Sequence, residues 1–189
     1  MKILLLFILS VSLFQTGCST TRKTGTGTTS FPESTHLAIN ETPVNFYEQS
    51  TWLLGYINPV QMHNPPHSEW YRKGYDEYQY DRDIVNKLTE IDKDELTIII
   101  VLGTWCPDSR REVPRFMRIL DIWEFPAGKV EFIGVDNAKL SPVGEYDKLN
   151  IERVPTFIIY RNNIEAGRII ENPLTSLEQD MINILTRNE

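Results

Sequence analysis

The chain has 189 residues, a formal net charge of −7 and a pI near 5.1. This acidic balance excludes non-specific binding to nucleic acid, which needs a surplus of Lys and Arg to neutralise phosphates. A composition that is 41% hydrophobic and 11% aromatic is typical of a globular domain, and two cysteines are too few for a disulfide scaffold or a zinc knuckle.

The N-terminus predicts an export signal. Lys2 precedes an apolar run that is shorter than the roughly 20 residues needed to span a bilayer. The run extends from Ile3 to Phe14 and is followed by Gln15-Thr16-Gly17-Cys18. A small residue directly before a cysteine at the end of such a run resembles a bacterial lipobox. Gln15 departs from that pattern, which has an aliphatic residue at this place. The resemblance implies a signal peptide over 1–17 and a lipid anchor at Cys18, on the periplasmic face of a bacterial membrane. A plain secretory signal is the alternative.

Residues 18–42 are predicted to be the lipidated cysteine and a flexible tether. The stretch from Ser19 to Ser30 is rich in Thr, Ser and Gly and contains no apolar residue. Such a stretch cannot bury enough surface to offset the entropy lost on ordering. We expect it to hold a folded domain near a membrane while leaving that domain free to rotate.

The segment 43–90 is rich in aromatic residues and predicts turns followed by two helices. Ser68 to Tyr78 carries aromatic residues at helical spacing, and Asp81 can cap a second helix. The aromatic stripe is interpreted as core packing rather than as a wall that faces a substrate. His63 and His67 flank two prolines, which exclude a helical ligand pair, so we predict a surface loop there and no metal site.

The segment 91–189 predicts an α/β core. The run from Thr97 to Leu102 is mostly β-branched and does not alternate, which predicts a strand buried on both faces. The other expected elements are an amphipathic helix after Cys106, a strand at 130–135, a short helix at 142–149, a strand at 156–160, a turn at 162–163 into a strand at 166–170, and a last helix whose start, Thr175 to Glu178, has capping-box spacing. This order predicts a parallel βαβ unit followed by a hairpin and a helix.

Four features of this core resemble the thioredoxin family. Trp105 precedes Cys106, the cysteine lies at a strand-to-helix turn, Pro114 lies inside the following helix, and Val154-Pro155-Thr156 opens a late strand. The resemblance implies a thioredoxin-like α/β fold, with a central mixed β-sheet flanked by helices. The aromatic-rich segment then forms an N-terminal extension of the kind seen in thioredoxin-like bacterial lipoproteins.

The resemblance also implies the roles of the site residues. Cys106 is the reactive thiol, and Pro155 is the proline that is cis in this fold and lies against the cysteine. The backbone of Val154 is expected to pair with an extended substrate segment, with Trp105 and Pro107 beside it.

The position of Cys106 favours a reactive thiol on physical grounds as well. The unpaired N–H groups and the positive dipole at a helix N-terminus stabilise thiolate over thiol. Arg110 and Arg111 are expected to add to this effect, and Asp108 to oppose it. An inert buried cysteine is the alternative.

Three departures from the family pattern concern the second thiol of its CxxC motif. Ser109 stands where that thiol is expected, Ile100 replaces the buried acid, and Phe132 replaces the lysine that partners the acid. Ser109 can donate a hydrogen bond to a Cys106 thiolate, but it cannot resolve a mixed disulfide. The machinery that serves a second thiol is therefore absent together with that thiol.

These residues predict a monothiol protein that exchanges with protein thiols or disulfides. It needs an external reducing thiol or redox partner, and neither a cofactor nor a metal is expected. A redox-silent binding module with the same fold is the alternative. A one-cysteine peroxidase is a distant third, because Thr104 lies two residues before Cys106 instead of three.

Overall fold

The computed structural model describes residues 43–187, so the predicted signal peptide, Cys18 and the tether lie outside the described residues. The described part is built on one sheet of five strands in the order β1-β3-β2-β4-β5. No helix within residues 43–187 is long and apolar enough to cross a membrane.

The predicted strands form the centre of this sheet. β2 (Leu96–Leu102) pairs in parallel with β3 (Val130–Gly134) and antiparallel with β4 (Thr156–Arg161). β4 forms a hairpin with β5 (Ile164–Ile170) through Asn162-Asn163, both with positive φ as a tight hairpin turn requires. The predicted βαβ unit and the hairpin are thus confirmed.

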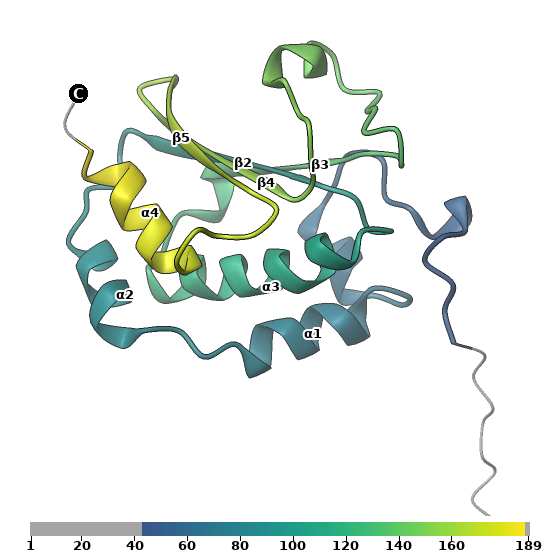
Figure 1. The fold of residues 1–189 in the computed structure, drawn as a ribbon, viewed down its shortest axis with the longest axis horizontal. Helices are drawn as coiled ribbons and strands as arrows, with labels where there is room; N and C mark the ends of the chain where they lie inside the picture. Colours follow the sequence, from purple (N-terminus) through teal and green to yellow (C-terminus); the bar gives the residue numbers. More distant parts are fainter. Residues whose placement is uncertain (1–42, 188–189) are drawn as a thin grey trace, which may run out of the picture. The chain divides into compact units, whose positions relative to one another are not determined.

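Four helices cover one face of the sheet (Figure 1). They are α1 (Ser68–Glu77), α2 (Arg82–Thr89), α3 (Pro107–Ile122) and α4 (Leu177–Leu185). Asp81 caps α2 as predicted, because its carboxylate accepts two backbone N–H bonds at the helix start. Short 3₁₀ helices connect these elements: η1 (Gln49–Thr51), η2 (Pro59–His63), η3 (Ala127–Lys129) and η4 (Tyr146–Leu149).

α4 begins differently from the predicted capping box. Ser176, and not Thr175, is the cap residue, since its hydroxyl accepts from the N–H of Gln179. Glu178 is buried instead, and it accepts a hydrogen bond of 2.7 Å from the Tyr78 hydroxyl. The prediction for this helix start was wrong because a partner distant in the sequence claims the carboxylate.

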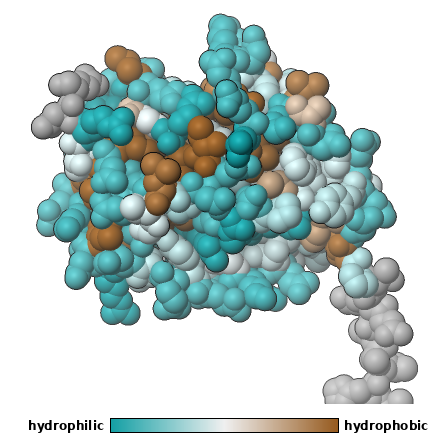
Figure 2. All heavy atoms as spheres, viewed as in Figure 1, coloured by the Kyte–Doolittle hydropathy of each residue, from teal (hydrophilic) through white to brown (hydrophobic). Residues whose placement is uncertain are grey.

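The opposite face of the sheet is covered only in part. The chain between β3 and β4, with η4, packs over the C-terminal half of β2, where Val101 is buried. In the first half of that strand Thr97 is exposed and Ile99 is half-buried. The prediction of a strand buried on both faces is therefore wrong there. The short helix predicted at 142–149 is present only as the 3₁₀ helix η4, over its last four residues. Hydrophobic side chains gather over the sheet, while hydrophilic ones cover the helices (Figure 2).

The aromatic-rich extension adds a strand that the sequence pattern did not predict. β1 (Gly55–Tyr56) pairs antiparallel with the end of β3, and Ile57 donates a backbone hydrogen bond of 2.9 Å to Phe132. A Cβ atom on Gly134 would lie 2.0 Å from the carbonyl oxygen of Leu53. This close approach of two backbones requires glycine.

Replacing Gly134 with alanine is expected to push residues 53–57 away from β3, since the methyl group overlaps a backbone oxygen. We expect a loss of about 1–3 kcal/mol in the free energy of unfolding, measured by urea denaturation. Gly144→Ala is the control, because a Cβ atom there meets nothing within 4 Å. Equal losses in the two variants would contradict the close packing at Gly134.

Candidate functional site

Cys106 lies at the start of α3, directly after the loop that ends β2. It is the N-cap residue, with φ −79° and ψ 124°, and Pro107 occupies the first helical turn. Its N–H donates to the Gly103 carbonyl, and its own carbonyl accepts from the N–H of Arg110. Within residues 43–187 it is the one free cysteine, and it is 7% exposed.

The loop before β4 brings a second part of the predicted site to Cys106. The Val154–Pro155 peptide bond is cis, as the resemblance implied. The thiol of Cys106 donates to the Val154 carbonyl oxygen, 3.3 Å from Sγ. The structure therefore places these three residues together, while their roles toward a substrate stay predictions.

Ser109 is fully buried one helical turn after Cys106. Its hydroxyl oxygen accepts a hydrogen bond of 3.2 Å from the N–H of Gly103. Ile100 and Phe132 are register partners on β2 and β3, and both lie in the main core. An apolar pair thus stands where the resemblance places an acid and a lysine, and Ser109 binds the backbone of the loop.

Trp105 is held flat against its own loop. Its indole N–H donates to the Val135 carbonyl at 3.0 Å, and a Cβ atom on Gly103 would lie 2.5 Å from the indole ring. Trp52 from the extension packs beside it with ring centroids 6.3 Å apart. The two indoles form an aromatic wall next to the start of α3.

Thr104 ties the extension to the loop that carries Cys106. Its hydroxyl accepts from the N–H of Leu53 at 3.1 Å and donates to the Thr51 carbonyl at 3.4 Å. In the sequence, Thr104 was considered only for peroxidase chemistry, and its role in binding the extension was not predicted. The available signal was a polar residue in a buried loop, since such a group needs hydrogen-bond partners.

Arg110 is the cation nearest to the loop. Its guanidinium donates to the carbonyls of Thr104 and Trp105 at 3.0 and 2.8 Å, and it lies 4.4 Å from the centre of the Phe46 ring. Burial lowers the pKa of Arg110, and the neighbouring Cys106 opposes this shift. A guanidinium stays charged despite such a shift.

Arg111, the other predicted cation, points to acidic neighbours. It forms ion pairs of 2.7 Å with Asp108 and 2.6 Å with the buried Glu112. These hydrogen bonds raise the pKa of Arg111. The charges of Arg111 and Asp108 therefore offset one another near the helix start.

His67 is buried near Arg110, and its ring packs between those of Phe46 and Trp70. Burial, and next the charge of Arg110, lower the pKa of His67 below its ordinary value of 6.5. Its Nδ1 atom has no hydrogen-bond partner within the described part of the chain. His67 is thus a neutral packing residue under the aromatic extension at pH 7.

His67 predicts a loss of stability in acid. Its pKa is lower in the folded state, so its contribution is present above about pH 6.5 and is lost as the pH falls through the folded value. We expect the free energy of unfolding of His67→Phe to fall less between pH 7 and pH 5 than that of the unchanged chain. The exposed His63, changed to Gln, is the control. Parallel pH profiles for all three proteins would contradict this expectation.

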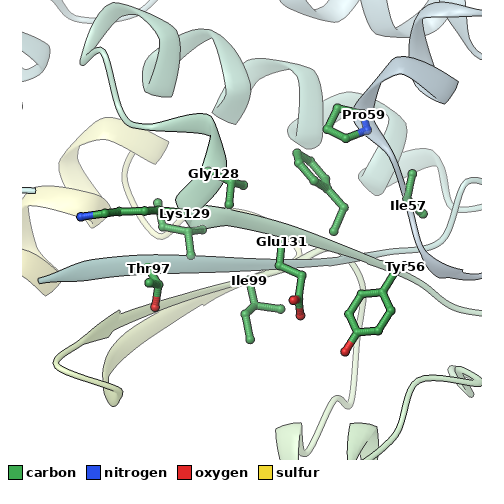
Figure 3. Close-up of a pocket in the computed structure, with 11 residues that line it drawn as sticks. Tyr56, Ile57, Pro59, Thr97, Ile99, Gly128, Lys129 and Glu131 are labelled. Carbon is green, nitrogen blue, oxygen red and sulfur yellow. The ribbon is translucent and has the colours of Figure 1, made fainter. Parts of the chain in front are cut away.

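One cavity lies away from Cys106, on the uncovered half of the sheet. It measures about 490 Å³, and none of the predicted site residues lines it. Figure 3 shows Thr97, Ile99 and Glu131 pointing to the same side of the strands, with Tyr56 at one end. The cavity is therefore separate from the candidate site.

Comparisons with known proteins find similar solved structures, those given below with TM-scores under 0.5. No protein-family model and no curated protein matches the chain. A thioredoxin from Trypanosoma brucei brucei is 26% identical, with a TM-score of 0.34 over 58% of this chain and 89% of its own. Fasciola hepatica thioredoxin is 20% identical, with a TM-score of 0.35 over 57% and 89%. A Pseudomonas aeruginosa protein of unknown function is 13% identical, with a TM-score of 0.43 over 61% and 77%. The chain has a thioredoxin-like fold, a mixed five-stranded sheet with flanking helices.

Proposed function

We propose that this is an exported, membrane-tethered protein that takes part in thiol–disulfide exchange through the single thiol of Cys106. The main support for the proposal is the structural environment of that thiol. Cys106 caps the N-terminus of α3, lies against the Val154–Pro155 bond, and has Arg110 beside it. A helix N-terminus and a nearby cation are the surroundings that activate cysteines.

The proposed exchange passes through a mixed disulfide and returns Cys106 to its reduced form. The Cys106 thiolate attacks one sulfur of a protein disulfide, which forms a mixed disulfide and releases the other sulfur as a thiolate. Ser109 cannot attack this intermediate, so an external thiol displaces the protein substrate from Cys106. A second external thiol then frees Cys106, and the two external thiols become a disulfide. Two electrons pass from the external thiols to the substrate.

The hydrogen bond between Cys106 and Val154 links the thiol to substrate binding. The Cys106 thiol donates this hydrogen bond to the Val154 carbonyl oxygen. A carbonyl oxygen has two lone pairs, so an extended substrate segment can also donate to it. A segment that pairs with Val154 is then held beside the Cys106 thiol.

The second candidate is a redox-silent binding module. It is favoured by the low exposure of Cys106 and by the apolar pair Ile100 and Phe132. In that case the surface beside Pro155 holds a partner without reacting with it.

A peptide disulfide distinguishes the two functions. The reduced full chain is mixed with the peptide in excess, and adducts are located by mass spectrometry. We expect an adduct on Cys106 that an added small thiol releases and that forms faster in the folded chain than in urea. Cys106→Ala should lose this adduct, whereas Cys18→Ala should keep it. A Cys106 that reacts no faster folded than unfolded would favour the binding module.

The anchor has its own test. Cys18→Ala is expected to move the protein from the membrane fraction to the soluble periplasmic fraction of expressing bacteria, because the lipidated sulfur is lost. Cys106→Ala is the matched control and should stay with the membrane. Retention of the Cys18 variant on the membrane would argue against lipidation at this residue.

A further inference from the structure

A basic groove runs between α1 and α3, next to the candidate site. It measures about 370 Å³. Its lining combines four cations, two aromatic rings and one carboxylate: Lys73, Arg110, Arg111, Arg115, Trp70, Tyr78 and Glu77, together with Gly74. Such a concentration of positive charge stands out in a chain whose net charge is −7.

The two helices approach very closely at the groove. A Cβ atom on Gly74 of α1 would lie 2.5 Å from the Pro114 ring of α3, so only glycine permits this contact. Figure 1 shows α1 running beside α3. Long side chains on both sides of the contact then form the walls, with the Tyr78 ring 5.5 Å from the guanidinium of Arg115.

The cations of the groove differ in how far they are neutralised. Arg111 and Arg115 share the buried carboxylate of Glu112, at 2.6 and 3.1 Å. Arg110 instead hydrogen-bonds to neutral carbonyl oxygens and lies over the Phe46 ring. Lys73 forms no ion pair within the described residues. Positive charge without an acidic partner therefore remains at two places along the groove.

Arg110 connects the groove to the reactive thiol, because its guanidinium also binds the loop that leads into Cys106. We propose that the groove binds an acidic segment of the protein substrate whose sulfur reacts at Cys106, an inference that rests on the proposed function. Carboxylates of the segment meet Lys73 and Arg110, and its apolar atoms pack on Trp70. A concave groove of this kind suits a peptide better than a flat lipid surface.

Binding is measured without redox chemistry. Two labelled peptides lacking cysteine, one rich in Glu and its twin with Gln at those positions, are titrated into the full chain carrying Cys106→Ala. We expect about tenfold tighter binding of the acidic peptide at low salt, and convergence of the two affinities at high salt. Lys73→Gln should weaken the acidic peptide about threefold, as is typical of one exposed charge. Lys87→Gln, an exposed lysine of α2, should change nothing.

Three outcomes would contradict the proposal that the groove binds an acidic segment. They are equal affinity for the two peptides, an equal effect of the two lysine variants, and binding of the Cys18→Ala chain to phosphatidylglycerol vesicles that depends on Lys73. The last outcome would assign the groove to a membrane.

Reaction rates keep the two proposals apart. The same peptide pair, each with one disulfide, is reacted with the chain that retains Cys106. If mixed disulfides form equally fast with both peptides, the proposed thiol exchange is supported and the proposed binding of an acidic segment in the groove is contradicted. Selective binding without any mixed disulfide would keep the groove and reject thiol exchange. Both proposals together predict a faster reaction of the acidic peptide.

Discussion

Replacing Phe116 with alanine is expected to lower the free energy of unfolding by about 3–5 kcal/mol. The ring is fully buried where α3 crosses the sheet, and it stacks on Phe157 of β4 with centroids 4.3 Å apart. Removing it leaves a cavity between a helix and a strand that other contacts hold in place. Urea denaturation followed by circular dichroism measures the loss.

Leu174 provides the control for this experiment, because its side chain is 96% exposed. Leu174→Ala is expected to stay within about 0.5 kcal/mol of the unchanged chain. A Phe116→Ala variant that loses no more than this would show that the core between α3 and β4 is packed differently.

Replacing Ser109 with cysteine is expected to raise the rate at which the pre-reduced chain reduces protein disulfides about tenfold or more when no small thiol is added. The reason is that the change restores a second thiol one helical turn after Cys106. Attack by the new thiol within one molecule releases the reduced substrate and leaves an internal disulfide. The pre-reduced variant therefore completes one turnover without the external thiol that the unchanged chain needs, and later turnovers require a reductant. The assay follows reduction of a protein disulfide with and without added small thiol. The buried hydroxyl that now accepts from Gly103 is lost, so folding of the variant is checked by circular dichroism.

Ser68→Cys is the matched control, since it adds a thiol on α1, away from the start of α3. It should remain dependent on an external thiol. A folded Ser109→Cys variant that still needs added thiol for its first turnover would contradict the monothiol account of this site.

The central strands and most helices were predictable because their signals are local. The β-branched run of β2 and the capping carboxylate of Asp81 act within a few residues. β1 was not predictable, because two residues carry no periodicity and this strand exists only through its pairing with β3. Likewise, both Thr175 and Ser176 can cap a helix, and the distant hydroxyl of Tyr78 decides what Glu178 does.

The candidate site divides in the same way. The proximity of Cys106 to the cis Val154–Pro155 bond was predictable because the residues around both form recognisable motifs. The support of the loop by the extension was not found: Thr104 binds Leu53, 51 residues earlier, and Arg110 lies over Phe46. No spacing in the sequence signals such contacts, because they depend on how the chain folds back.

The contact between Trp52 and Trp105 gives the protein an optical reporter of its own. Two indoles at 6.3 Å, one in the extension and one beside the thiol, are held in a fixed asymmetric arrangement. Near-ultraviolet circular dichroism is sensitive to such packing of aromatic rings. The part of the spectrum that Trp52→Phe removes therefore registers, without any label, whether the extension lies on the loop that carries Cys106 when a partner binds or the thiol reacts.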